Sequence, residues 1–136
     1  MIAEALVKQH QELAQAADAV LAALPEGEVP DAATVKQLLL RLLGKLTVHL
    51  ATEDEQVYPL LVRHTDAKVR EVAARLQQEV GGLAHAVDAY KAKWPSARAI
   101  QLRPGEFARH TRLLLAALAQ RTQRENAELF PLLENR

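Results

Sequence analysis

The sequence predicts an all-α protein, an up-down-up-down four-helix bundle made from a duplicated helix pair. Aromatic residues make up 4% of the 136 residues and apolar residues 49%, which suits helices packed through Leu, Ala and Val better than a β-sandwich. Four segments carry apolar residues at spacings of three, four and seven, separated by short turns. We expect one domain over 1–136, with repeats at about 2–64 and 66–136.

The first repeat contains the first two predicted helices. One runs from Ile2 to Leu24 and stops before Pro25, because proline disfavours helical geometry in the residue before it. Asp31 is the expected N-cap of the next helix, which Pro59 should kink or end. Their apolar stripes are Leu6, Leu13, Ala17, Val20 and Leu24, then Leu39, Leu42, Leu46, Leu50, Val57 and Leu61.

The second repeat contains the other two helices. Thr65 or Asp66 is expected to cap the third, which continues to Trp94. Residues 95–105 read as the longest loop, and the fourth helix follows Pro104. The stripes are Val69, Leu76, Val80, Leu83, Val87, Tyr90 and Trp94, then Phe107, Leu114, Ala117, Leu118 and Leu132.

Composition excludes several classes of function. Positive and negative side chains number 17 each, so no basic field for nucleic acid or anionic lipid is implied. The absence of cysteine excludes disulfides and thiol chemistry. No apolar run resembles a secretory signal or reaches the length of a membrane span. We therefore expect a cytoplasmic protein without nucleic-acid or membrane partners, and its neutral, apolar composition is compatible with a homodimer or an unidentified protein partner.

An internal repeat underlies the helix pattern. Residues 6–25 align with 76–95, and residues 49–61 align with 121–133. The second alignment matches Tyr58-Pro59 with Phe130-Pro131. Two aligned blocks in the same order, each with a shared proline near its end, indicate duplication of a helix pair.

The first repeat carries a candidate metal site. His49 and Glu53 are four residues apart, so both project from one face of a helix and can chelate one ion. His10 lies on the apolar stripe of the neighbouring helix, at a depth within about one turn of His49. These two histidines and the carboxylate are a set of ligands typical of metal sites inside helix bundles.

The second repeat lacks most of this set. Val80 stands where the first repeat has His10, Arg121 where it has His49, and only Glu125 keeps its ligand type. Valine has no donor atom, and the arginine guanidinium has no lone pair to give. The sequence therefore has ligands for about one ion.

The whole pattern resembles the hemerythrin-like HHE cation-binding domains. In that family a histidine in the first helix is followed by His-x-x-x-Glu and an aromatic-proline pair in the second, and the set recurs in the next helix pair. The segment from His49 to Pro59 fits this pattern. The resemblance implies a carboxylate-bridged di-iron centre used for oxygen binding, iron sensing or repair of iron centres. It carries over His10, His49, Glu53 and Glu125 as metal ligands, but neither Val80 nor Arg121, so we expect a half-degenerate site.

Arg121 is a candidate replacement for the missing ion. Glu53 and Glu125 would face each other in the core, where uncompensated carboxylates are costly. The guanidinium one turn before Glu125 can pair with either carboxylate, and its charge would repel a second divalent cation. We expect Tyr58 to pack in the core or to hydrogen-bond to the site.

The remaining candidates are expected to lie outside the site. His85 lies almost opposite the apolar stripe of its helix and should be exposed. His64 follows the Pro59 break and should also be exposed. His110 should lie in the core or at its rim, far from Arg121. In the run from Glu53 to Glu55, only Glu53 is expected to point inward.

Three functions remain open. The first is a non-enzymatic metal-binding domain with one iron, manganese or zinc ion and no di-iron centre, acting in iron, redox or oxygen sensing or handling. The second is a metal-free bundle serving as an interaction or dimerisation module, with Arg121, Glu53 and Glu125 as a salt-bridged core. The third is a mononuclear non-haem iron enzyme, because two histidines and a carboxylate match the ligand types of a facial triad.

Overall fold

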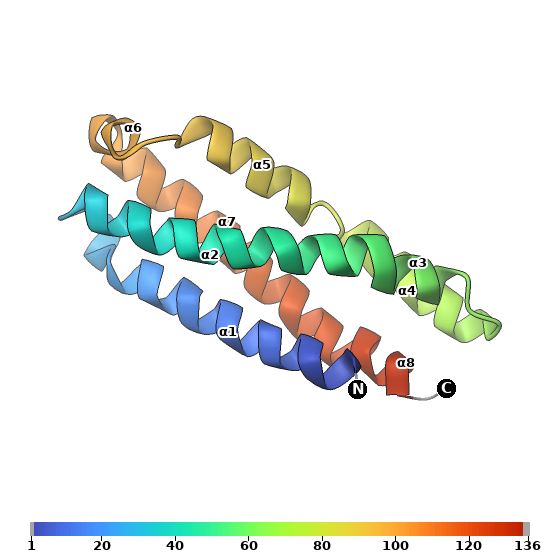
Figure 1. The fold of residues 1–136 in the computed structure, drawn as a ribbon. Helices are drawn as coiled ribbons and strands as arrows, with labels where there is room; N and C mark the ends of the chain where they lie inside the picture. Colours follow the sequence, from blue (N-terminus) through green and yellow to red (C-terminus); the bar gives the residue numbers. More distant parts are fainter. Residues whose placement is uncertain (1, 135–136) are drawn as a thin grey trace.

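The computed structural model describes residues 2–134, with side chains to residue 133, and every regular element in this part of the chain is helical. The predicted all-α class is therefore confirmed. Long helices lie side by side in an elongated bundle, and the helix that begins at Ile2 starts at the same end of it as the helix that stops at Glu134 (Figure 1). The outermost parts of the predicted domain, residues 1, 135 and 136, lie outside the described residues.

The elements of the first repeat follow the predicted order. They are α1 (Ile2–Ala22), a 3-10 turn (Pro25–Gly27), α2 (Ala32–Thr52), a π-helix η2 (Glu53–Val57) and α3 (Tyr58–Val62). α1 ends two residues earlier than predicted because Leu24, before proline, takes a non-helical conformation. Asp31 caps α2, since its carboxylate accepts a hydrogen bond from the Thr34 amide at 3.2 Å.

The second repeat contains α4 (Ala67–Val80), α5 (Leu83–Lys93), α6 (Ala97–Leu102), α7 (Pro104–Arg124), a π-helix η3 (Glu125–Leu129) and α8 (Phe130–Glu134). Asp66, rather than Thr65, caps α4 by accepting from the Lys68 amide. The expected single third helix is broken at Gly81 and Gly82. A Cβ on Gly81 would lie 2.2 Å from the Gln77 carbonyl oxygen, so the break requires glycine there.

Two further predictions for the second repeat were wrong. The segment expected to be the longest loop contains α6, whose N-terminus is capped by Ser96 and whose Ile100 is fully buried. The cap and the buried Ile100, with the partly buried Ala97 and Ala99, stabilise this short helix against α2 and α7. Ala117 is exposed because the buried stripe of α7 passes through Leu114, Leu115 and Leu118, and residue 117 lies out of phase with it.

The core consists of two apolar clusters separated by a layer of polar side chains. The larger cluster contains Leu13, Leu46, Leu83 and Leu118 and reaches the α6 end of the bundle. The smaller contains Leu6, Val57, Leu76 and Leu129 and lies at the end that holds α3 and α8. The buried polar side chains at the level between them are His10, His49, Glu53, Arg121 and Glu125.

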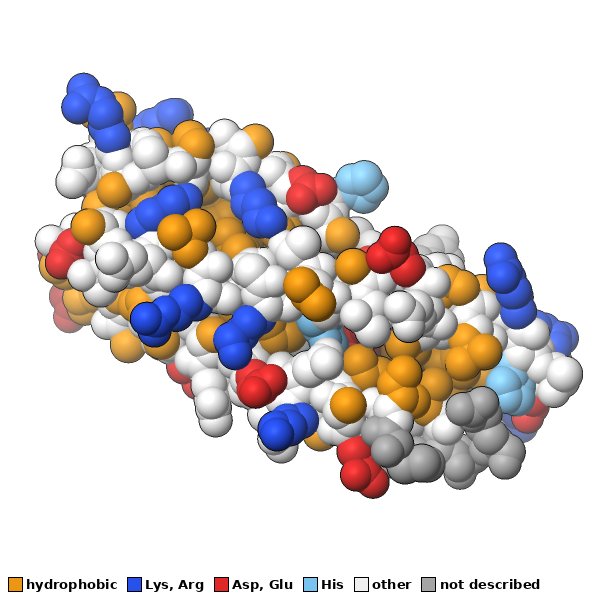
Figure 2. Space-filling model, in the orientation of Figure 1, with side chains coloured by type: hydrophobic (Ala, Val, Ile, Leu, Met, Phe, Trp, Pro, Cys, Tyr) orange, Lys and Arg blue, Asp and Glu red, His pale blue; other side chains and the backbone are white. Residues whose placement is uncertain are grey.

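The surface carries both signs of charge. On the face drawn in Figure 2, the Lys and Arg side chains are interspersed with Asp and Glu and with apolar patches. None of the described helices combines the length and the apolar composition needed to cross a membrane.

Candidate metal centre

Two π-helices place the carboxylates of the polar layer. Glu53 opens η2 and Glu125 opens η3, and in each the carbonyl of the glutamate accepts from the amide five residues on, at Tyr58 and Phe130. A proline follows each of these aromatic residues and has no N–H to donate, while its ring crowds the carbonyl four residues back. The wider π turn accommodates both effects. The kink or end predicted at Pro59 therefore takes the form of a π turn.

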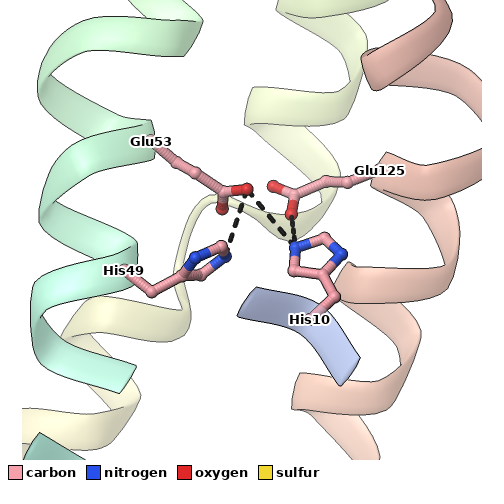
Figure 3. Close-up of side chains that lie close together, drawn as sticks. All are labelled: His10, His49, Glu53 and Glu125. Atoms are coloured by element: carbon pink, nitrogen blue, oxygen red, sulfur yellow. Dashed lines mark ion pairs between the residues drawn. The ribbon is translucent and has the colours of Figure 1, made fainter. Parts of the chain in front are cut away.

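Four side chains converge between the helices (Figure 3). Nε2 of His10 lies 3.4 Å from Oε2 of Glu53 and 3.1 Å from Oε1 of Glu125. Nε2 of His49 lies 3.2 Å from the same Glu53 oxygen. One donor atom from each of the four lies within 4.8 Å of the others, and all four residues are buried. The predicted set His10, His49, Glu53 and Glu125 is thus brought together from α1, α2, η2 and η3.

Apart from these contacts with one another, the inward-facing atoms of the four residues have no hydrogen-bond partner in the described part of the chain. They are Nε2 of His10 and His49, Oε2 of Glu53 and Oε1 of Glu125. Buried polar atoms are nearly always hydrogen-bonded, so four such atoms aimed at one point need an explanation. Two imidazole nitrogens and two carboxylate oxygens are ligands that divalent transition metals accept. The donor set therefore fits a metal ion.

Amide side chains hold the other nitrogen of each imidazole. Nδ1 of His10 lies 2.8 Å from Oδ1 of Asn126, and Nδ1 of His49 lies 2.6 Å from Oε1 of Gln9. Neither amide was predicted from the sequence. Their places in the sequence could have identified them, since Gln9 directly precedes His10 and Asn126 directly follows Glu125.

Arg121 fills the side of the layer opposite the histidines. Its Nε donates to Oε2 of Glu125 at 2.9 Å, and its NH2 group donates to Oε1 of Glu53 at 3.1 Å. The same NH2 reaches Oδ1 of Asp54 at 2.8 Å, and NH1 reaches the Val80 carbonyl at 3.4 Å. Each glutamate therefore gives one oxygen to the guanidinium and keeps the other facing the histidines.

Asp54 and Tyr58 complete the surroundings of Arg121 and the carboxylates. Asp54 was expected to be solvated, but the π turn directs it to the guanidinium beside Glu53. The Tyr58 hydroxyl donates to Oε2 of Glu125 at 2.9 Å, the hydrogen bond that the sequence suggested. Burial and the neighbouring negative charge raise the pKa of Tyr58 well above its ordinary value, so this hydroxyl remains a donor.

The charges of the layer depend on one another. Burial alone would lower the pKa of His10, but the facing carboxylates of Glu125 and Glu53 outweigh it and raise that pKa to about 9. Burial opposes ionisation of Glu53, yet the two imidazoles hold its pKa well below the usual range. Burial, together with the charge of Glu53, raises the pKa of Glu125. The layer therefore favours a positive charge between the carboxylates and the histidines.

The other histidines lie outside this cluster. His85 is exposed, as predicted. His64 is half-buried rather than exposed, because its Nδ1 accepts from the Asp66 amide in the turn before α4. His110 lies at the rim of the core, where its Nδ1 accepts from the Trp94 indole at 2.9 Å.

Surface grooves approach the layer on two sides. A groove of about 800 Å³ between α1 and α7 is lined by His10 and Asn126, with Gln11 and Gln123 beside them. A smaller one of about 400 Å³ between α1 and α2 is lined by His49 and Gln9. Each groove therefore reaches one histidine and the amide that bonds it.

Comparison with known proteins identifies a family. The family model described as the hemerythrin HHE cation-binding domain matches residues 1–133. No curated protein and no solved structure matches the chain significantly.

Proposed function

Because the chain belongs to the hemerythrin HHE cation-binding family, we propose that it binds one metal ion through His10, His49, Glu53 and Glu125. The observation that carries the proposal is the convergence of four buried ligand atoms that, among residues 2–133, have no hydrogen-bond partner outside their own cluster. When bound, an iron ion would supply one-electron redox chemistry there. Manganese and zinc accept the same ligand types.

One ion, rather than a pair, follows from the charges of the layer. Glu53, Glu125 and Asp54 carry three negative charges when ionised, and Arg121 returns one positive charge. One divalent ion balances the remainder, whereas a second would leave a buried excess of positive charge. Val80 also supplies no ligand on that side. Reversible oxygen carriage on two irons is therefore disfavoured, and iron or redox sensing or handling is the role that we propose.

Elemental analysis of the protein, purified without chelator and loaded with Fe²⁺, Mn²⁺ or Zn²⁺, tests the proposal. We expect one equivalent of metal in the wild type, loss of it in His49→Ala, and no change in His85→Ala, whose histidine is exposed. A wild type that binds none of the three metals would refute the proposal. The double variant Val80→His with Arg121→His should raise the stoichiometry from one to two, and an unchanged value would refute the role of Arg121.

A metal-free interaction or dimerisation module is the second candidate. Its support is the ion pairs of Arg121, which compensate Glu53 and Glu125 without any added ion. Thermal melting with metal and with chelator separates the two, because an ion that binds only the folded state raises Tm. Equal Tm values would favour this candidate, and its partner would then be sought as a homodimer or another protein.

A mononuclear non-haem iron enzyme is the third candidate. The groove that reaches His10 and Asn126 is the feature in its favour, because a substrate could approach along it. Consumption of oxygen or peroxide by the iron-loaded protein would support it, and its absence would leave the non-enzymatic role.

We also propose that the bundle arose by duplication into an up-down-up-down fold, since both π-helices begin at the aligned glutamates.

A further inference from the structure

Each histidine of the polar layer is fixed through the nitrogen that faces away from the carboxylates. The partner of each Nδ1 is an amide oxygen, from Asn126 for His10 and from Gln9 for His49. An amide oxygen can only accept a hydrogen bond, so each Nδ1 must carry the proton. The lone pair of the neutral imidazole is then on Nε2, the atom that faces Glu53 and Glu125.

The two amides come from residues next to the site residues in the chain. Gln9 precedes His10 on α1 but reaches across to His49 of α2. Asn126 follows Glu125 within η3 and reaches back to His10 of α1. In this way α1 is tied to α2 and to η3 at the level of the layer, and the rotation of both rings is restricted.

Each amide also lines a surface groove together with the ring that it bonds. Asn126 lines the larger groove with His10, and Gln9 lines the smaller with His49. Gln11 and Gln123 line the larger groove as well, yet among the described residues neither bonds to a histidine. As controls, they share the amide group of both test residues, the residue type of Gln9 and the groove of Asn126.

We propose that Gln9 and Asn126 are positioning residues that set the tautomer and orientation of His49 and His10 for cation binding. This inference rests on the proposed function for its effect on affinity. An acceptor for the Nδ1–H group fixes the orientation of the ring and makes Nε2 a better ligand. Loss of such an acceptor typically weakens metal binding 10–100-fold. Asp or Glu in its place keeps an acceptor.

Zinc affinity, measured by competition with a chelating dye, is the first readout. We expect Asn126→Leu and Gln9→Leu to weaken binding about 10–100-fold each at unchanged stoichiometry, and Asn126→Asp and Gln9→Glu to restore it. The controls Gln11→Leu and Gln123→Leu should bind like the wild type. Alanine replaces leucine at either position where a leucine variant does not fold. Wild-type affinity in both amide-free variants would overturn the proposal.

The second readout needs no metal. The ring Nδ1–H protons of His10 and His49 should appear in the proton NMR spectrum of metal-free protein as signals protected from exchange with solvent. Each should disappear in the variant that lacks its amide and persist in the two controls. A wild type with these signals but no metal affinity would refute the proposed function and leave the positioning intact. Signals that survive in the leucine variants would overturn the positioning.

Discussion

Replacing Arg121 by methionine removes the internal cation while nearly keeping the volume of the side chain. Arg121 is 1% exposed, and its partners Glu53 and Glu125 are 0% exposed, so both carboxylates lose a buried ion pair at once. Removing one partner of such a pair typically costs about 3–5 kcal/mol, because the remaining charge is left without compensation. The pair with Asp54 adds little, since that side chain is 33% exposed.

Urea denaturation of metal-free protein measures this cost. Arg121→Met should lower the free energy of unfolding by about 3–5 kcal/mol. Saturating divalent metal should restore more stability in this variant than in the wild type, because the ion then compensates carboxylates that have no other partner. Arg124→Met is the matched control, since Arg124 lies one turn along the same helix but pairs with Glu79 and Glu128 at the surface. Equal costs for the two variants would refute the reasoning.

Three further predictions concern other parts of the bundle. Tyr58→Phe removes the hydrogen bond to Glu125 and should cost about 1.5–3 kcal/mol in urea denaturation, as for bonds to charged groups; an unchanged stability would contradict it. Gly81→Ala should destabilise the protein by about 1–3 kcal/mol, because the added Cβ meets the Gln77 carbonyl. Gly44→Ala, whose added Cβ has nothing within 4 Å, should stabilise α2 by up to about 1 kcal/mol. Changes in the free energy of unfolding with the same sign in both variants would contradict these two predictions. Burial and the charge of Lys93 lower the pKa of His110, and the opposing effect of Glu106 is smaller. As pH falls below about 6.5, this histidine is therefore protonated in the unfolded chain before it is protonated in the folded protein. Stability from His110 should therefore be lost towards acid pH, and the fluorescence of Trp94, the single tryptophan, should follow the same titration; a His110→Gln variant with an unaltered profile would contradict this assignment.

The sequence predicts most of the site because the site obeys helical periodicity. Regular α-helix joins His49 to Glu53, the first residue of η2, and joins Arg121 to Glu125, the first residue of η3, so the ordinary period applies to both pairs. The depth of His10 follows from its place in the apolar stripe. The pairing of Arg121 with both glutamates follows from charge alone, and the distances agree with that expectation.

Features that depend on departures from the regular helix could not be predicted in this way. Asp54 follows Glu53 directly, so a regular helix directs it away, and only the π turn lets both contact Arg121. The break at Gly81 depends on a backbone contact within the helix itself. The helix α6 depends on the burial of Ile100 against α2 and α7, a tertiary contact that a local pattern does not contain.

The division of the core into two compartments has a consequence for local opening. Among the residues whose side chains the structure describes, the smaller compartment, at the α3 and α8 end, holds fewer buried ones than the larger. Its partial unfolding therefore requires less free energy than unfolding of the whole molecule. Such local unfolding would expose Glu53 and Glu125 to solvent while the α6 end stayed folded. Amide hydrogen exchange in the two π turns, measured with and without metal, would then report how much a metal ion in the polar layer stabilises the contact between the two halves of the molecule.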